Sequence, residues 1–170
     1  LWLLECNPLA KQHLIQSAQQ SGIDASRLIF APRVDMQTHI SRLALADLFL
    51  DTLPYNAHTT ASDALWAGLP LLTAMGTTFP GRVAASLLSA AGLPELIAES
   101  LAEYEALAIR LAREPQTLAA IRAKLARNLP SSPLFDTARF TRNLEAAFQT
   151  MVERQNSGER PATFAVEVTP

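Results

Sequence analysis

The chain has 170 residues, of which 49% are hydrophobic and 18% are charged, and its formal net charge is −2 at pH 7. This composition is typical of a globular protein, so it excludes a chain that is disordered throughout. The chain has no excess of positive charge to attract a phosphate backbone, which argues against binding to nucleic acid. No apolar run approaches the roughly 18 residues of a membrane helix and no signal peptide opens the chain, so we expect no membrane segment and a cytoplasmic location.

The first 95 residues alternate between short apolar strands and helices. Asn7 is placed to cap a helix that reaches about residue 20, and Asp35 is placed to cap the next helix. Short apolar strands separated by helices imply a parallel sheet with helices on both faces, which is an α/β fold. The strands are predicted at residues 1–5, 27–30, 46–51 and 71–74.

The later residues are predicted to be almost entirely helical. A helix capped by Thr59 or Thr60 is predicted to end near Ala67, where Gly68 is placed as a left-handed stop. Further helices are predicted over residues 82–91, from the capping box at Ser100 to about residue 114, over 115–128, and from Asp136 onward. Residues 156–170 are polar and are expected to form a tail. Because residue 1 is not Met and opens inside an apolar run, we expect the chain to belong to a longer protein.

The loop after the third strand carries the most unusual sequence in the chain, Asn56-Ala57-His58-Thr59-Thr60. Open parallel sheets bind ligands beyond the carboxyl ends of their strands, and this loop lies in that position. A helix start leaves free backbone N–H groups and a partial positive charge, to which Thr59, Thr60 and His58 add further donors. These groups together predict a site for a phosphate or diphosphate, with Asp63 placed to accept two hydrogen bonds from a ribose diol.

Simpler roles account for the same residues. Thr60 and Asp63 also match a capping box, which needs no ligand, and His58 can be a loop residue that is hydrogen-bonded to backbone. From spacing alone these simpler roles are favoured.

A second candidate set consists of Arg33, His39 and Arg42. His39 and Arg42 are three residues apart, so on a helix they share one face. An imidazole can stack on a base, and a guanidinium can donate to the carbonyl oxygens of a base. The alternative is a solvated polar face, which is favoured when these residues are considered alone.

Two other kinds of chemistry are not indicated. The three histidines are far apart in sequence and no Asp-x-Asp pair occurs, so no metal site is predicted. A G-x-S-x-G elbow for a serine nucleophile is missing.

Cys6 is the one cysteine and cannot form an internal disulfide, so we expect it to be a small core residue.

Several segments, in order along the chain, resemble the protein O-GlcNAc transferase family, and the composition is similar to that of its bacterial homologues. The likeness reaches about residue 153 and is carried by residues 46–52, 56–60, 65–68, 82–86, 95–98 and 131–135. The resemblance implies a GT-B fold, in which two Rossmann-like lobes hold the nucleotide-sugar in their cleft. Residues 1–155 would be the nucleotide-sugar-binding C-terminal lobe, followed by the polar tail at 156–170.

The resemblance also implies an activity. The family transfers N-acetylglucosamine from UDP-GlcNAc to Ser or Thr hydroxyls of proteins, with inversion and without a metal or other cofactor. The implied partners are UDP-GlcNAc or UDP, protein acceptors, and the N-terminal catalytic lobe and tetratricopeptide repeats of the same protein. The catalytic base and the phosphate-binding lysine of the family would lie upstream of residue 1.

Individual site residues follow from the same resemblance. In the family, the residues that match His58, Thr59 and Thr60 hold the diphosphate near the sugar, and His58 would stabilise the leaving group. Asp63 would bind the ribose hydroxyls, and Tyr55 stands where the family lines the sugar pocket. His39 would stack on uracil, Arg42 would reach its edge, and the backbone of Val34 would bond to it.

One departure and two other functions remain open. Met36 stands where the animal proteins carry a lysine, which puts one nucleotide contact in question.

A different GT-B enzyme, acting on another sugar or acceptor, is one alternative function. A catalytically silent nucleotide-binding or scaffold lobe is the other.

Overall fold

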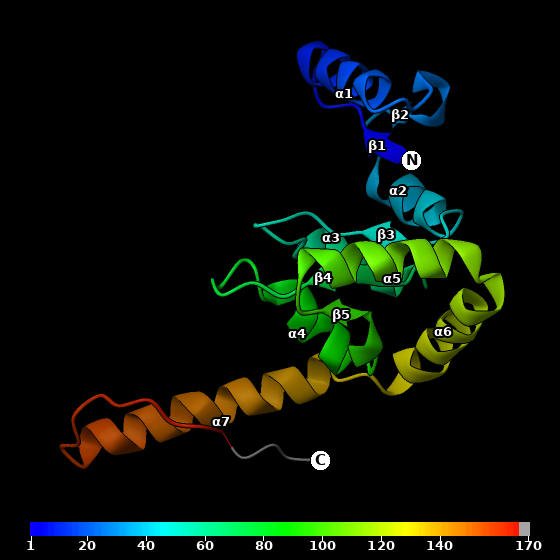
Figure 1. The fold of residues 1–170 in the computed structure, drawn as a ribbon. Coiled ribbons are helices and arrows are strands. Elements are labelled where there is room, and N and C mark those ends of the chain that lie inside the picture. The colour runs from blue at the N-terminus through cyan, green and yellow to red at the C-terminus, as the bar shows by residue number, and fades with distance from the viewer. Residues whose placement is uncertain (167–170) are drawn as a thin grey trace. The chain divides into compact units, whose positions relative to one another are not determined.

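The computed structural model describes residues 1–166. It divides into two compact units, Leu1–Arg42 and a second unit that begins at Leu43 (Figure 1).

The first unit contains two strands and two helices. Strand β1 (Trp2–Leu4) pairs in parallel with β2 (Ile29–Ala31), and helices α1 (Pro8–Gln20) and α2 (Met36–Leu43) follow the two strands. Both predicted caps are confirmed, because Asn7 Oδ1 accepts from the Ala10 N–H at 2.7 Å and Asp35 Oδ1 accepts from the Thr38 N–H at 3.0 Å. Side-chain caps of this kind satisfy donors that the first turn leaves unpaired.

This unit buries little apolar surface. Ala31 is buried, whereas Trp2, Leu4 and Ile29 are exposed on the paired strands. Cys6 is a free and exposed thiol just after β1, so the prediction that it is a core residue is wrong. The physical reason is that about 40 residues are too few to build a closed core of their own.

The second unit is built on a three-stranded parallel sheet in the order β3-β4-β5. Its strands are β3 (Phe49–Leu50), β4 (Leu71–Ala74) and β5 (Ile97–Ala98). The parallel pairing is confirmed, but the four predicted strands divide between two sheets instead of forming one, and β5 was not predicted. It has two residues directly after a 3₁₀ helix at Pro94–Leu96, whereas the two residues of β3 lie in a longer apolar run between Asp47 and Asp51 that marked a strand.

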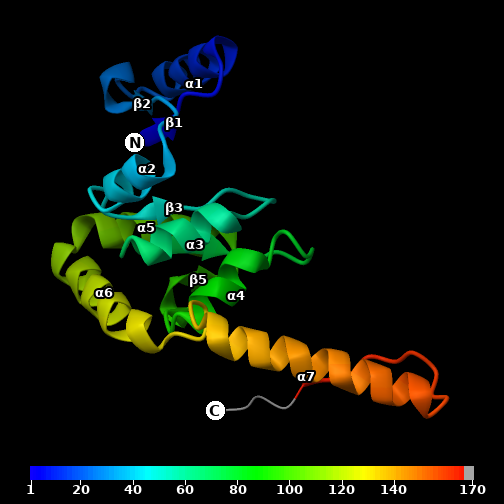
Figure 2. The same cartoon turned by 180° about the vertical axis from the view of Figure 1, so that it is seen from behind.

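Helices cover both faces of this sheet, as predicted. Figure 1 shows α5 (Leu101–Arg113) in front of the strands, and Figure 2, from behind, shows α3 (Thr59–Trp66) and α4 (Val83–Ala90) on the other side. Leu71 and Leu72 are adjacent in β4 and therefore face opposite sides, yet both are 0% exposed. They share the core with Leu65, Leu88, Leu111 and Leu125.

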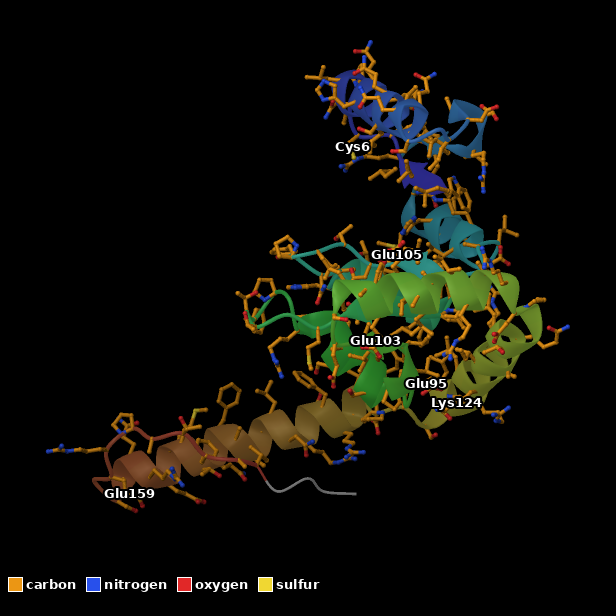
Figure 3. All side chains as sticks on the ribbon, in the orientation of Figure 1. Cys6, Glu95, Glu103, Glu105, Lys124 and Glu159 are labelled. Atoms are coloured by element: carbon orange, nitrogen blue, oxygen red, sulfur yellow. The ribbon has the colours of Figure 1, made fainter. Side chains whose placement is uncertain are left out.

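The remaining helices are α6 (Pro115–Asn128) and α7 (Thr137–Asn156). As predicted, Ser100 caps α5 by accepting from the Glu103 N–H, and Asp136 caps α7 by accepting from the Arg139 N–H. Lys124 and Glu95, both labelled in Figure 3, form an exposed ion pair of 2.7 Å between α6 and the 3₁₀ helix. Such exposed pairs contribute little to stability. None of the helices in residues 1–166 is long and apolar enough to cross a membrane.

Replacing Leu72 with alanine tests this core. Leu72→Ala removes a side chain that is fully buried in the central strand, so we expect a loss of about 2–5 kcal/mol in the free energy of unfolding. Leu101→Ala is the matched control, because Leu101 is 68% exposed and its loss is expected to cost less than about 0.5 kcal/mol. Urea unfolding of both variants measures the difference, and equal losses would contradict the assigned core.

Candidate functional site

A buried carboxylate stands at the carboxyl end of β3. Asp51 is 5% exposed, and its Oδ1 accepts from the backbone N–H groups of Thr52 at 2.8 Å and Ala57 at 2.7 Å. Its Oδ2 accepts from the hydroxyl of Thr73, in the neighbouring strand β4, at 2.6 Å. Three donors therefore satisfy this carboxylate, which ties the loop before α3 to the edge of the sheet.

The loop that follows β4 packs against the loop that follows β3. The buried Asn56 donates its backbone N–H to the Pro80 carbonyl at 3.1 Å, and its Nδ2 donates to the Thr52 carbonyl at 3.1 Å. At Gly81, a Cβ would lie 3.1 Å from the Pro54 carbonyl oxygen, so the two backbones approach closely. The loops meet because β3 and β4 are parallel neighbours, so that their carboxyl ends share one edge.

Helix α3 begins between these loops with open donors. It starts at Thr59, its N-cap residue is His58, and the cap makes no side-chain hydrogen bond. In the described part of the chain, the backbone N–H groups of Thr59 and Thr60 have no hydrogen-bond partner. Both threonines are exposed, and Asp63 is half-buried one turn further along the helix. The predicted cluster of donors at a helix start is therefore present.

Helix α3 begins at a different place from the one predicted, which also rules out the predicted capping box. Thr59 and Thr60 were expected to cap the helix, but both lie inside it. The capping box of Thr60 and Asp63 is therefore not formed. The physical reason is that the Ala57 N–H is held by Asp51, which turns the chain so that the helix begins directly after His58.

The imidazole of His58 lies between groups from both loops. It stacks on the Tyr55 ring at 5.0 Å with an interplanar angle of 17°, and it meets the Phe79 ring edge-on at 6.0 Å. Its Nε2 lies 3.4 Å from the Pro80 carbonyl oxygen, an acceptor, so Nε2 is the donor of this contact. Sequence analysis gave a backbone hydrogen bond of His58 as the alternative to a binding role, and this bond is present. It uses Nε2, so Nδ1 is not engaged by it.

In the first unit, the Arg42 side chain contacts His39, a member of the second candidate set, and the backbone of Pro32. Its Nη1 donates to the Pro32 carbonyl at 2.7 Å, and its Nη2 lies 3.1 Å from Nδ1 of His39. A guanidinium only donates, so Nδ1 accepts and the neutral ring carries its proton on Nε2. His39 and Arg42 share a face, as predicted, and both are half-buried, so this is not a fully solvated face. Arg33 is exposed.

The eight candidate residues fall into two groups, one in each unit. Val34, His39 and Arg42 lie in the first unit, where Val34 is exposed and directly precedes the cap of α2. The second unit brings together the other five at the start of α3: Tyr55, His58, Thr59, Thr60 and Asp63. Across residues 1–166, no three His, Cys, Asp or Glu side chains gather into a group that could hold a metal ion.

Sequence analysis missed the residues that hold the site together. Asp51, Asn56 and Pro80 make the contacts that position His58, and the contacts of Pro80 with Asn56 and His58 join residues far apart in the chain. The one available signal was an aspartate at the end of a predicted strand. Tyr104 in α5 also supports the loop, because its hydroxyl donates to the Asp51 backbone carbonyl at 2.9 Å.

A model of glycosyl transferase family 41 matches residues 1–144 of this chain. The chain belongs to this family. Its resemblance to the protein O-GlcNAc transferases, first seen in the order of its motifs, is confirmed.

Named relatives of this family 41 chain extend the comparison. The UDP-N-acetylglucosamine–peptide N-acetylglucosaminyltransferase of Caenorhabditis elegans is 37% identical over 158 residues, which are 93% of this chain and 14% of that protein. A probable enzyme of the same name from Arabidopsis thaliana is 38% identical over 167 residues, which are 98% of this chain and 17% of that protein. The chain thus spans less than a fifth of the length of either relative.

A solved structure supports the fold. A mutant O-GlcNAc transferase from Thermobaculum terrenum matches with a TM-score of 0.82 at 34% sequence identity, over 89% of this chain and 30% of that chain. The predicted fold class, an α/β lobe of the kind found in an O-GlcNAc transferase, is therefore confirmed.

The role of Asp51 in this family 41 chain can be tested by substitution. Asp51→Ala leaves three donors without their acceptor, so we expect the free energy of unfolding to fall by about 2–4 kcal/mol. Asp47→Ala is the control, because Asp47 is an exposed aspartate that precedes the same strand. Denaturant unfolding decides between them, and an unchanged midpoint for Asp51→Ala would show that the carboxylate does not hold the loop.

The environment of Tyr104 leads us to expect that the stability of the protein depends on pH in the alkaline range. Burial, followed by the charge of Asp51, raises the pKa of Tyr104 above its ordinary value. The folded protein therefore holds the phenol proton more tightly than the unfolded chain does. This contribution to stability is complete below a pH of about 10 and is lost as the pH rises through the raised pKa. We expect Tyr104→Phe to remove that alkaline loss from the unfolding free energy, whereas Tyr55→Phe should keep it. Identical pH profiles for Tyr104→Phe and the unmodified protein would refute this.

Proposed function

We propose that this chain supplies the UDP-binding half of a glycosyltransferase that moves N-acetylglucosamine from UDP-GlcNAc to Ser or Thr hydroxyls of proteins. Membership of family 41 and the names of the relatives support this proposal. The single observation that carries it is the open start of α3, where the N–H groups of Thr59 and Thr60 lie unpaired beside His58. The reaction inverts the sugar and needs no metal.

The proposed chemistry matches the charges at this helix start. The acceptor hydroxyl oxygen attacks the anomeric carbon from the face opposite UDP, and its proton passes to a base. The bond between the sugar and the diphosphate oxygen breaks, and its electron pair leaves with UDP. Unpaired N–H groups, the positive end of the α3 dipole and the His58 imidazole stabilise this charge as it develops. The base and a phosphate-binding lysine are proposed to come from outside this chain.

The remaining candidate residues have proposed roles toward the ribose, the sugar and the base. Asp63 can accept two hydrogen bonds from the ribose hydroxyls, and Tyr55, exposed beside His58, would line the sugar pocket. His39 would stack on uracil and the backbone of Val34 would bond to it, while Arg42 would reach the uracil edge. The hydrogen bonds from Arg42 to His39 and to the Pro32 carbonyl support this arrangement, because they tie the imidazole to the backbone two residues before Val34.

The same proposal covers the organisation of the protein. Residues 1–155 would form the nucleotide-sugar-binding lobe, and residues 156–170 the polar tail. The partners would be UDP-GlcNAc, protein acceptors, and a second catalytic lobe with tetratricopeptide repeats in the same protein. We propose a cytoplasmic location.

A donor and acceptor assay of the full-length protein tests this function. We expect sugar transfer from UDP-GlcNAc to a Ser- or Thr-containing peptide, at a rate that a metal chelator does not change. Competition with GDP- and ADP-sugars identifies a different nucleotide-sugar enzyme if either displaces UDP-GlcNAc. UDP binding without any transfer would indicate a silent nucleotide-binding lobe instead.

Two substitutions separate the proposed roles at α3. His58→Ala removes a group that faces the leaving diphosphate, so kcat at saturating UDP-GlcNAc should fall by about 10²–10³-fold. Asp63→Ala removes the ribose acceptor, so UDP affinity should fall by roughly tenfold or more while kcat changes little. Asp47→Ala, an exposed aspartate outside this site, is the control for both. Single-turnover rates for His58→Ala equal to those of the unmodified protein, or unchanged UDP affinity for Asp63→Ala in calorimetry, would contradict these roles.

A further inference from the structure

Phe79 is an exposed aromatic residue that core packing does not explain. It lies in the loop between β4 and α4 and is 79% exposed, although a phenylalanine ring gains stability by burial. Its ring meets the His58 imidazole at 6.0 Å with an interplanar angle of 88°. This edge-to-face arrangement is one that aromatic rings prefer at such distances. The ring is therefore placed against the imidazole and not against the core.

The base of this loop is closed by hydrogen bonds. The Gly76 N–H donates to the Gly81 carbonyl at 2.7 Å, and the Met75 N–H donates to the Ala98 carbonyl at 2.9 Å. At Gly76, a Cβ would lie 3.3 Å from the Gly81 carbonyl oxygen, so the two ends of the loop run close together. Phe79 thus stands in a short loop whose ends are held by the sheet.

Two further groups contact the imidazole: Tyr55 from the loop after β3, and Pro80 from the same loop as Phe79. The Tyr55 ring stacks on His58 at 5.0 Å, and the Pro80 carbonyl lies 3.4 Å from Nε2. These three groups restrict the imidazole. Tyr55 and Phe79 both do so through exposed side chains, and Phe79 is the more exposed of the two, at 79% against 63%. Removing its ring should free the imidazole without opening the core.

We propose that Phe79 is a positioning residue that holds the His58 imidazole at the start of α3. The consequence for the reaction rests on the proposed function, whereas the ring contact itself does not. A preorganised donor stabilises developing charge without having to reorient during the reaction. Losing that order lowers the rate of the chemical step, while UDP still has the N–H groups of Thr59 and Thr60 to bind.

Kinetics of matched variants in the full-length protein test this inference. Phe79→Leu keeps apolar bulk but removes the ring, so kcat should fall by about tenfold while KM for UDP-GlcNAc stays within about twofold. Phe79→Tyr keeps the ring and should restore kcat. Leu101→Ala is the control for the loss of an exposed apolar side chain. A raised KM at constant kcat would overturn the inference, because Phe79 would then contact the donor directly. Equal losses in Phe79→Leu and Phe79→Tyr would also overturn it.

A second readout does not depend on activity. The imidazole C–H resonances of His58, measured by NMR in histidine-labelled protein, should shift and broaden in Phe79→Leu, because a nearby ring current is lost and the ring moves more freely. They should change little in Phe79→Tyr and Leu101→Ala. Unchanged His58 resonances in Phe79→Leu would refute the contact. A protein that transfers no sugar but shows this NMR change would refute the proposed function and keep the positioning role.

Discussion

The candidate site depends on the buried carboxylate of Asp51. This group accepts from Thr52 and Ala57 in the loop before α3 and from Thr73 in the neighbouring strand. Holding the Ala57 N–H sets the place where the helix begins, directly after His58. Side-chain caps satisfy a first donor of α1, α5 and α7, whereas α3, like α4 and α6, has no such cap. An uncapped and exposed helix start can accept an anion, and here the tie to the sheet keeps it in place.

An open helix end costs stability, and the core beneath it offsets that cost. Strand β4 is buried on both faces, and leucines of four helices contribute to the core around it. The two loops above the sheet edge then pack on each other through Asn56, Pro80 and Gly81. The residues proposed to meet UDP in this unit therefore stand either in the loop that Asp51 ties to the sheet, as Tyr55 and His58 do, or in the first turns of α3, as Thr59, Thr60 and Asp63 do. This rigidity is what a charge-stabilising site requires, since its donors must already be oriented when the bond breaks.

Sequence reasoning succeeded where structure is decided locally. The caps at Asn7, Asp35, Ser100 and Asp136 were predicted because each bond joins residues three apart. The shared face of His39 and Arg42 followed from helical spacing in the same way. Strand β5 was missed because its two residues directly follow a 3₁₀ helix, whereas the two residues of β3 lie in a longer apolar run. The exposed Cys6 was misassigned because an apolar strand beside it implied a core that the first unit does not build.

The same limit applies to the site. The donors at Thr59 and Thr60 were predicted from their place after a strand, whereas the cap position was wrong because a bond from Asp51 decides it. Phe79 and Pro80 could not be connected with His58 from the sequence, since more than 20 residues separate them.

The most direct test of the account is a crystal structure of the full-length protein with UDP. The account predicts diphosphate oxygens within hydrogen-bonding distance of the Thr59 and Thr60 N–H groups, beside the His58 ring. A diphosphate bound elsewhere, with the start of α3 still free, would contradict it.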